Sequence, residues 1–304
     1  MNLQTETPTE SSVKPALRVK YVVISPVRDE AAYLRFTIRS MISQTIRPTQ
    51  WILVNDGSTD KTAAIIDEAA TQHSWITPVH RINRGFRQAG GGVVQAFNEG
   101  YSRIAISDWQ FVVKLDGDLS FDADYFERCF TCFRNEPRLG VGGGAMYHMV
   151  NGHEHLEKGP VFHVRGATKI YSRECWDAIG GFVPAAGWDT LDEVKAQMLG
   201  WNTRCFFDIR LIHHRTTGAA DGSWKSSVKY GKANYVSGYH PLFVLAKSVR
   251  RLLKKPYIID SAGILYGYIS SYFNGTSRVD DPRLIAFVRR QQLRRLIGAE
   301  SIWK

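Results

Sequence analysis

The sequence predicts an α/β fold in which helices cover both faces of a sheet, followed by a basic, mainly helical C-terminal extension. Four short apolar runs have the length and the β-branched or aromatic composition of buried strands. They are Lys20–Ser25, Trp51–Val54, Val79–Ile82 and Phe111–Leu115. Segments of helical periodicity separate them at spacings of about 25 to 30 residues, which is typical of right-handed crossovers between parallel strands. Acidic residues follow three of these runs, where an open sheet binds its ligands.

Composition and charge divide the chain into two parts. Its 304 residues are 44% hydrophobic and 22% charged, which is ordinary for a globular protein and fits one large domain with an appendage, or two small domains. The net charge of +10 is uneven, because Lys225–Lys304 holds 15 Lys and Arg against 4 Asp and Glu. We therefore expect a disordered lead-in at 1–18, an α/β domain at 19–222 and a basic amphipathic helical region at 223–304, with the boundary near Gly218–Trp224.

The first two predicted strands each lead into a polar turn and an amphipathic helix. Pro26 ends the first strand, and a helix opens at Val27–Glu30. Its apolar face is formed by Leu34, Ile38, Met41 and Ile42. After the second strand, Asn55–Asp60 reads as a tight turn in which Ser or Thr caps the next helix. That helix carries Ile65, Ile66 and Ala69.

The fourth strand ends in two closely spaced carboxylates. The third strand, Val79–Ile82, precedes a Gly- and Arg-rich loop at Asn83–Gly92 and a helix over 93–104, and then Phe111–Leu115 runs into Asp116-Gly117-Asp118. Two unpaired like charges raise each other's pKa. A divalent cation such as Mg²⁺ or Mn²⁺ would justify ionising both, because hard cations bind carboxylate oxygens and share them with substrate phosphates. A solvated turn is the alternative for the Asp-x-Asp motif alone.

Taken in order, these motifs resemble the nucleotide-sugar half of family-2 glycosyltransferases, which have the GT-A fold. The motifs are VVISPVRDE at 22–30, LVNDGSTD at 53–60, NRG at 83–85 and LDGD at 115–118. Gly166–Tyr171 and Ile179–Phe182 are similar to the segment that this family places beside the sugar. His213 and His214 follow a predicted strand at Thr203–Ile212, where the family tends to place a metal-binding His. The similarity covers roughly Val22 to Thr217.

The resemblance implies a divalent metal, Mn²⁺ or Mg²⁺, and a nucleotide-diphosphate sugar as donor. Asp56 would contact the base, Asp116 would hold the ribose or a metal-bound water, and Asp118 would bind the metal. His213 or His214 would complete the metal site; alternation along a strand puts them on opposite faces, so we expect only one to face the metal. A structural pair at a strand end is the alternative. The donor-binding residues implied are Pro26, Asp29, Glu30, Asp56, Asn83, Asp116 and Gly117.

The general base of an inverting transferase would come from Gly187–Glu193. The family pattern, often Glu-Asp, lies about eleven residues before a Gly; counting back from Gly200 gives Asp189, with Trp188 in place of the Glu. Asp192 is the rival, followed by Glu193, although acidic residues at early helical positions also complement the helix dipole. Such a carboxylate would take the acceptor hydroxyl's proton as the anomeric carbon is attacked.

The C-terminal region is basic, Tyr-rich and amphipathic. It contains the apolar segments Tyr239–Ala246 and Tyr257–Phe273 and a last helix at Asp281–Ile297 with a row of arginines. These features suit an interface with anionic lipids, where a lipid-linked hydroxyl acceptor would be found. Helices packed on the first domain with a solvated basic face are the alternative.

Location follows from what the sequence lacks. No apolar run reaches the roughly 18 residues of a membrane span, and the N-terminus has no signal-peptide core. Four cysteines agree with a reducing compartment. We therefore expect a cytoplasmic protein attached peripherally to the cytoplasmic face of the membrane.

Other functional classes fit less well. A sugar nucleotidyltransferase would carry a Gly-rich, basic phosphate loop directly after the first strand, where this chain has SPVRDE. A nucleotide-binding protein without transfer activity is a further alternative. A nucleic-acid-binding module would leave the acidic strand ends unexplained, so we expect no nucleic-acid partner. The motifs do not specify the donor sugar, the nucleotide base, the acceptor or the oligomeric state.

Overall fold

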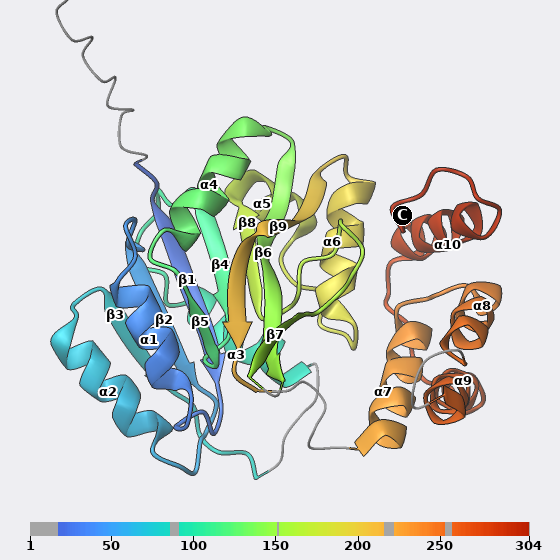
Figure 1. Cartoon of the computed structure of the whole chain (residues 1–304), viewed down its shortest axis with the longest axis horizontal. Coiled ribbons are helices and arrows are strands. Elements are labelled where there is room, and N and C mark those ends of the chain that lie inside the picture. Colours follow the sequence, from blue (N-terminus) through green and yellow to red (C-terminus); the bar gives the residue numbers. More distant parts are fainter. Residues whose placement is uncertain (1–17, 86–90, 151, 216–221, 253–256, 304) are drawn as a thin grey trace, which may run out of the picture.

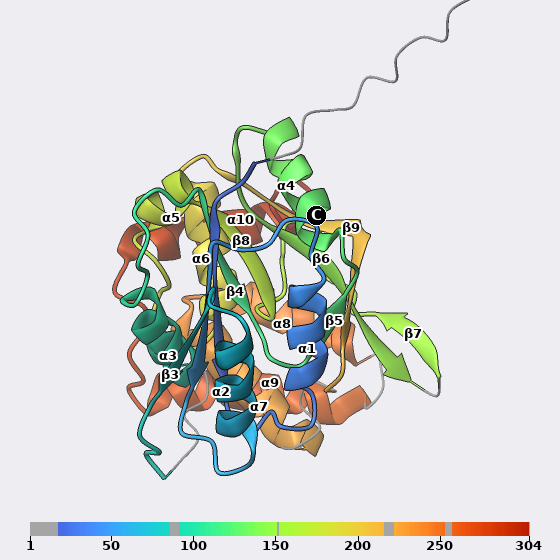
Figure 2. The ribbon, with the colours of Figure 1, turned by 90° about the vertical axis from the view of Figure 1, so that its left-hand side faces the viewer.

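The computed structural model describes residues 18–85, 91–150, 152–215, 222–252 and 257–303. Within these ranges nine strands form one mixed sheet in the order β3-β2-β1-β4-β8-β6-β9-β5, with β7 beside β6 (Figures 1 and 2). The bounds are β1 Tyr21–Val27, β2 Gln50–Asn55, β3 Ile76–His80, β4 Phe111–Leu115, β5 Leu119–Phe121, β6 Leu139–Val150, β7 His153–Leu156, β8 Thr168–Ser172 and β9 Asn202–His213.

The first four strands are parallel, as their spacing predicts. β1 pairs with both β2 and β4, and β2 pairs with β3. The remaining half is mixed, because β8 runs antiparallel to β4 and to β6, β9 runs parallel to β6, and β5 runs antiparallel to β9. Every residue of β1 and β2 is buried, which is why these strands are continuous apolar runs rather than alternating ones.

Helices cover both faces of the sheet (Figure 1). On one face α1 (Leu34–Ile42), α2 (Thr62–Gln72) and α4 (Tyr125–Asn135) pack on a core that includes Tyr21 and Val23. On the other, α3 (Gly91–Tyr101), α5 (Arg173–Ile179) and α6 (Trp188–Met198) pack on Val22 and Ile24. Successive side chains of β1 point to opposite faces of the sheet and therefore belong to two separate hydrophobic cores.

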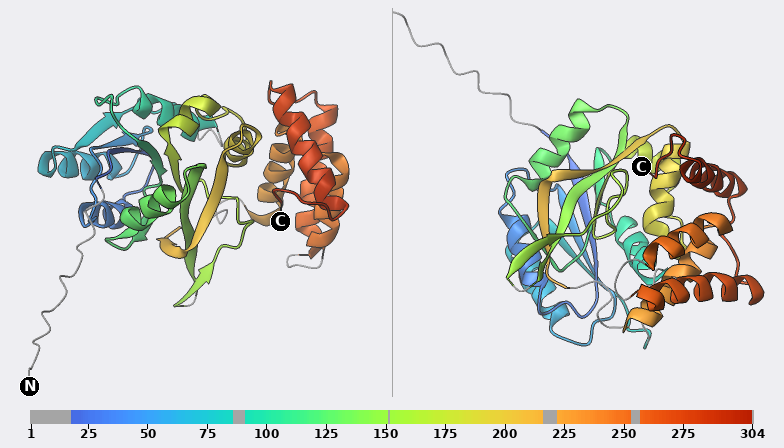
Figure 3. Two further views of the ribbon diagram at one scale, coloured as in Figure 1. Left: turned by 90° about the horizontal axis from the view of Figure 1, so that it is seen from above. Right: turned by 45° about the vertical axis from the view of Figure 1, so that its right-hand side comes forward.

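Four C-terminal helices lie beside α6 (Figure 3). They are α7 Gly222–Val236, α8 Pro241–Arg251, α9 Tyr257–Phe273 and α10 Pro282–Leu296. A third apolar cluster joins Leu191 and Val194 of α6 to residues of these helices, among them Val244 and Leu284. In the described residues no helix is both long and apolar enough to cross a membrane.

Glycines allow α7 and α9 to pack closely. A Cβ on Gly267 would lie 2.1 Å from the Val228 carbonyl oxygen, and one on Gly231 would lie 2.1 Å from the Ile264 carbonyl oxygen. Both distances are far below van der Waals contact, so these helices can approach only because the two side chains are absent. Gly267, which interrupts the apolar segment in the sequence, is thus a packing residue.

The start of the first helix differs from the prediction. The segment Arg28–Glu30 is a turn in which Asp29 has a left-handed φ of 54°, and α1 begins only at Leu34. The backbone N–H groups of Asp29 and Glu30 are instead taken by the side chains of Ser58 and Thr62. These tertiary hydrogen bonds replace the helical ones, which local periodicity alone could not reveal.

Four further predictions need correction. β1 does not stop at Pro26 but continues to Val27, because its pairing with β4 ends at Ile24 and leaves no partner that needs the missing N–H. β3 lies at Ile76–His80, so Ile82 is 94% exposed rather than in a strand. Ile42 lies at 37% exposure rather than on the buried face of α1. No Ser or Thr side chain caps α2, which follows Lys61.

Some predicted features lie outside the residues that the structure describes. The lead-in at 1–18 lies there apart from Arg18, as do residues 86–90 of the Gly- and Arg-rich loop and residues 218–221 of the proposed boundary. The loop segment that is described, Asn83–Gly85, takes part in the site below.

Candidate functional site

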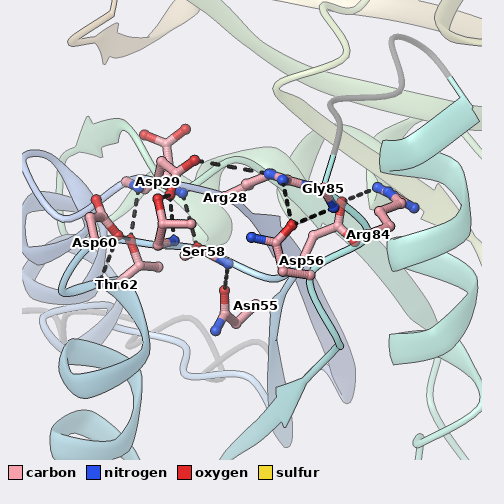
Figure 4. A network of polar contacts seen from close by, with 12 residues as sticks. Arg28, Asp29, Asn55, Asp56, Ser58, Asp60, Thr62, Arg84 and Gly85 are labelled. Carbon is pink, nitrogen blue, oxygen red and sulfur yellow. Dashed lines mark hydrogen bonds and ion pairs between the residues drawn. The ribbon is translucent and has the colours of Figure 1, made fainter.

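The loops that follow β1 and β2 form one polar network at the carboxyl edge of the sheet (Figure 4). The Ser58 Oγ accepts from the Asp29 N–H at 3.0 Å, and the Asp29 carboxylate accepts from the Thr59 N–H at 2.8 Å. Glu30 is 9% exposed and forms an ion pair at 2.5 Å with Arg215, which follows β9. Asp29 and Glu30 therefore join the ends of three strands that are distant in the sequence.

Asp56 is held between two guanidinium groups. Its carboxylate is paired with Arg81 through one oxygen and with Arg84 through the other, and the residue is only 8% exposed. The Asn83 side chain accepts a hydrogen bond from Arg28 at 3.0 Å. The turn is so tight that a Cβ on Gly57 would lie 2.5 Å from the Asn83 Cα. The two arginines therefore fix the orientation of this carboxylate.

The two aspartates after β4 have different surroundings. Asp116 is paired with the buried Lys114, and burial raises the pKa of Asp116 although Lys114 opposes the shift. Burial also disfavours ionisation of Asp118, but the hydrogen bond and charge of His213 lower the Asp118 pKa below its usual value. Asp118 Oδ2 lies 3.1 Å from His213 Nε2. Asp118 Oδ1 is buried and has no hydrogen-bond partner among the described residues.

The two histidines after β9 point to different partners. His213 contacts Asp118, whereas His214 lies 2.9 Å from the Ser120 hydroxyl and stacks on Phe36 with ring centroids 4.6 Å apart. Burial lowers the pKa of His213, but the Asp118 carboxylate outweighs that effect and raises it overall. The geometry thus brings His213, and not His214, to Asp118.

Pro26 and Gly117 shape the backbone between these groups. Pro26 is buried in β1 beside Val54 of β2. A Cβ on Gly117 would lie 2.6 Å from Val27 Cγ1. The turn between the two aspartates can therefore pack against β1 only because residue 117 is a glycine. Their backbones, rather than their side chains, contribute to the site.

The two candidates for the base have opposite environments. Asp192 and its neighbour Glu193 are completely buried, and both lie 2.9 Å from the ammonium of Lys169, which is also fully buried. Burial raises the pKa of Asp192 to about 6 despite Lys169, and Tyr171 donates a hydrogen bond to the same carboxylate. The Asp192 carboxylate is thus enclosed.

Asp189 is partly exposed in the first turn of α6. Its carboxylate forms no hydrogen bond or ion pair with the described part of the chain, while its backbone carbonyl accepts from Lys169. A Cβ on Gly166 would lie 3.3 Å from Asp189 Cβ, and the next residue, Ala167, accepts from the Asp116 N–H at 2.8 Å. The start of β8 therefore joins the two aspartates after β4 to the start of α6.

Sequence reasoning missed three contributors to this region. Arg215 ties Glu30 to the site, and its Nε lies 3.8 Å from Asp118 Oδ2. His148 and Glu157 lie beside His213. These residues carry no local motif and reach the site only through strand pairing, so only the run of histidines and acids at 148–157 could have drawn attention to them.

Comparison with known proteins identifies the family. Residues 22–185 match the model described as glycosyl transferase family 2, which is more than half of the chain. The chain is 29% identical over 116 residues to poly-beta-1,6-N-acetyl-D-glucosamine synthase of Staphylococcus epidermidis, covering 38% of this chain and 26% of that protein. It is 32% identical over 164 residues to glycosyltransferase GlyA of Streptococcus pneumoniae, covering 54% of this chain and 21% of that one. These matches span about a quarter of each curated relative.

Solved structures share the fold at low sequence identity. Mannosyltransferase PcManGT from Pyrobaculum calidifontis, solved with GDP-Man and Mn²⁺, gives a TM-score of 0.56 at 15% identity, over 97% of this chain and 80% of that one. S. aureus TarS in complex with UDP-GlcNAc gives 0.52 at 18% identity, over 86% and 74%. The mixed sheet flanked by helices is therefore the GT-A fold.

Proposed function

The chain belongs to glycosyltransferase family 2, and from this premise we propose that it is an inverting, divalent-metal-dependent enzyme. It moves a sugar from a nucleotide-diphosphate sugar to a hydroxyl of a growing glycan. The observation that carries the proposal is the Asp118–His213 pair at the carboxyl edge of the sheet, with the buried Asp118 Oδ1 left without a partner among the described residues. Buried carboxylate oxygens normally have partners, so this atom suits a bound cation.

Asp118 and His213 would hold the cation, which when bound neutralises charge on the departing diphosphate. The other residues of the edge orient the donor. Asp56, fixed by two arginines, would offer its remaining acceptor capacity to the base, and Asp116, paired with Lys114, would hold the ribose or a metal-bound water. Asp29, Glu30 and the backbone of Gly117 maintain the shape of this edge.

Asp189 is our candidate for the general base. It must meet the acceptor hydroxyl, and its carboxylate is partly exposed, whereas that of Asp192 is enclosed with Lys169. The hydrogen bond from Lys169 to the Asp189 carbonyl fixes the first turn of α6. We therefore assign Asp192 a structural part and Asp189 the proton transfer that activates the acceptor.

Transfer by the full-length chain tests the reaction. UDP- and GDP-sugars are incubated with Mn²⁺ and oligosaccharide acceptors, and NMR reports the anomeric configuration of the product. Asp189→Asn should reduce turnover about 10²- to 10⁴-fold without weakening donor binding, because it removes only the base. Asp118→Asn should abolish metal-dependent donor binding. The neighbouring variant Thr190→Ala is the matched control and should keep full turnover.

Other outcomes would overturn the assignment. Release of pyrophosphate, with formation of a nucleotide sugar from a sugar phosphate, would identify a nucleotidyltransferase. Absence of turnover with every donor, despite donor binding, would favour a binding role. Full turnover by Asp189→Asn would exclude Asp189 as the base.

We further propose that the region 223–304 holds the enzyme on the cytoplasmic face of an anionic membrane, where it meets a lipid-linked acceptor. Two neighbouring helices, α8 and α9, expose apolar side chains along one side each. These are Leu242, Leu245 and Val249 on α8, Leu252 directly after it, and Ile258, Ile259, Tyr266, Ile269, Tyr272 and Phe273 on α9, all between 41% and 79% exposed. A patch of this kind, in a region with a balance of fifteen basic to four acidic residues, suits an anionic lipid interface.

Vesicle binding tests this attachment. Full-length protein should cosediment with phosphatidylglycerol vesicles and much less with neutral ones, and Ile258→Ser with Phe273→Ser should weaken binding at least tenfold. Phe207→Ser, at a 39% exposed position of β9, is the control and should bind as the parent does. Equal binding by all proteins to both kinds of vesicle would refute the assignment.

A further inference from the structure

Three potential metal ligands meet beside the candidate donor site. His148 on β6 pairs in register with His213 on β9, and their rings lie 5.0 Å apart. Glu157 follows β7 and returns to β6, where its N–H donates to Met146 at 2.8 Å, and its carboxylate lies 3.0 Å from His148 Nε2. One ligand atom from each of His148, Glu157 and His213 lies within 4.8 Å of the other two.

The strand framework holds these three groups in place. The side chains of His148, Glu157 and His213 are only 15%, 23% and 10% exposed. Arg165 lies 3.1 Å from one oxygen of Glu157, so the other oxygen is the one directed at His148. A cation entering the cluster would therefore find the ligands already ordered.

The contact between His148 and Glu157 leaves two ring nitrogens of the cluster without a hydrogen-bond partner among the described residues. The Nδ1 atoms of both His148 and His213 are buried and have no hydrogen-bond partner within the described ranges. A buried imidazole nitrogen without a partner is unusual, because loss of its hydrogen bond to water is not compensated. Two such atoms, on rings whose centroids lie 5.0 Å apart, give this cluster coordinating capacity that no described residue uses.

We propose that His148, Glu157 and His213 form a second divalent-cation site that selects a transition metal such as Zn²⁺ over Mg²⁺. Two imidazoles and one carboxylate are a ligand set that zinc sites use, whereas Mg²⁺ requires mostly oxygen ligands. A neutral imidazole offers a single lone pair. A cation held here and one held at Asp118 therefore cannot both take His213, and occupancy of one site opposes that of the other.

Metal binding to the intact chain tests the site without donor or acceptor, so the result does not depend on the proposed transfer reaction. Metal-free protein is titrated calorimetrically with Zn²⁺ and with Mg²⁺, and bound Co²⁺ is followed by its visible spectrum. His148→Ala and Glu157→Gln should each weaken Zn²⁺ binding at least tenfold and alter the Co²⁺ spectrum. Asp118→Asn should weaken Zn²⁺ binding less than His148→Ala does, because Asp118 is not a ligand of this site and acts on it only through its hydrogen bond to His213.

His155→Ala is the matched control. His155 lies opposite His148 on the same hairpin but is exposed, so its loss should not change Zn²⁺ affinity. Loss of Zn²⁺ binding in Asp118→Asn with retention in His148→Ala would show that the cation occupies only the Asp118 site. An equal loss in His155→Ala would indicate non-specific chelation by the hairpin, and no Zn²⁺ binding by folded parent protein would refute the site. Far-ultraviolet circular dichroism in EDTA verifies folding, and Glu157→Gln, which keeps the side-chain shape, replaces His148→Ala if that variant unfolds.

Discussion

Replacing Lys169 by Met should strongly destabilise the protein. The ammonium is completely buried and lies 2.9 Å from both Asp192 and Glu193, which are also completely buried. At an effective dielectric constant of about 20, each contact is worth roughly 6 kcal/mol of attraction, most of which offsets desolvation of the charges. Removing Lys169 leaves two adjacent buried carboxylates without their cation, so we expect a loss of about 3 to 5 kcal/mol in unfolding free energy.

The loss should depend on pH in a defined direction. Burial already raises the pKa of Asp192 to about 6 with Lys169 present, and without the ammonium it should rise further. A carboxyl group whose folded pKa exceeds its unfolded value favours folding below the unfolded pKa, near 4, and loses that contribution as pH rises through the folded pKa. The difference between variant and parent should therefore be largest near pH 8 and should shrink towards pH 5.

Urea unfolding of parent and variant at both pH values measures this difference. Lys20→Met is the control, because the Lys20–Asp108 pair lies on the surface with both side chains more than half exposed, and it should not shift the midpoint measurably. Adding Asp192→Asn to Lys169→Met should restore part of the stability. A Lys169→Met protein that unfolds at the parent midpoint at pH 8, or a loss that grows towards pH 5, would refute the reasoning.

Two further substitutions probe other parts of the molecule. Gly267→Ala forces a Cβ against the Val228 carbonyl and should lower the unfolding free energy by about 1 to 3 kcal/mol, while Ser270→Ala on the same helix should change it little; equal urea midpoints for the two variants would contradict the close packing. Asp56→Asn should weaken binding of nucleoside diphosphates about tenfold by calorimetry, because a charged acceptor is lost; an unchanged Kd would exclude Asp56 from the base site.

Local chemistry was enough to predict which acidic side chains lie at one edge of the sheet. Apolar runs specified the strands β1, β2 and β4, and the carboxyl ends of parallel strands share one edge of the sheet. It followed that Asp29, Asp56 and the aspartates after β4 would gather there. Alternation along β9 likewise predicted that His213 and His214 would point to different partners, as they do.

Asp189 and Asp192 differ in burial, and this difference could not be predicted from the sequence. Both residues belong to the first turns of one helix and differ by three positions, so periodicity places them on the same side. Only the packing of α6 on β8 encloses Asp192 with Lys169 and leaves Asp189 accessible. In our proposal the candidate with the raised pKa, Asp192, is the structural residue.

The sequence by itself determined the family, the four parallel strands and the acidic edge, because these depend on composition and on regular repeats within short segments. The tertiary structure alone decided the late start of α1, the Arg215 contacts, the Lys169 cluster and the His148–Glu157–His213 cluster. Each of these joins residues far apart in the chain, through strand register and through hydrogen bonds between loops. Such pairings are set by the free energy of the whole packed molecule, which no short segment encodes.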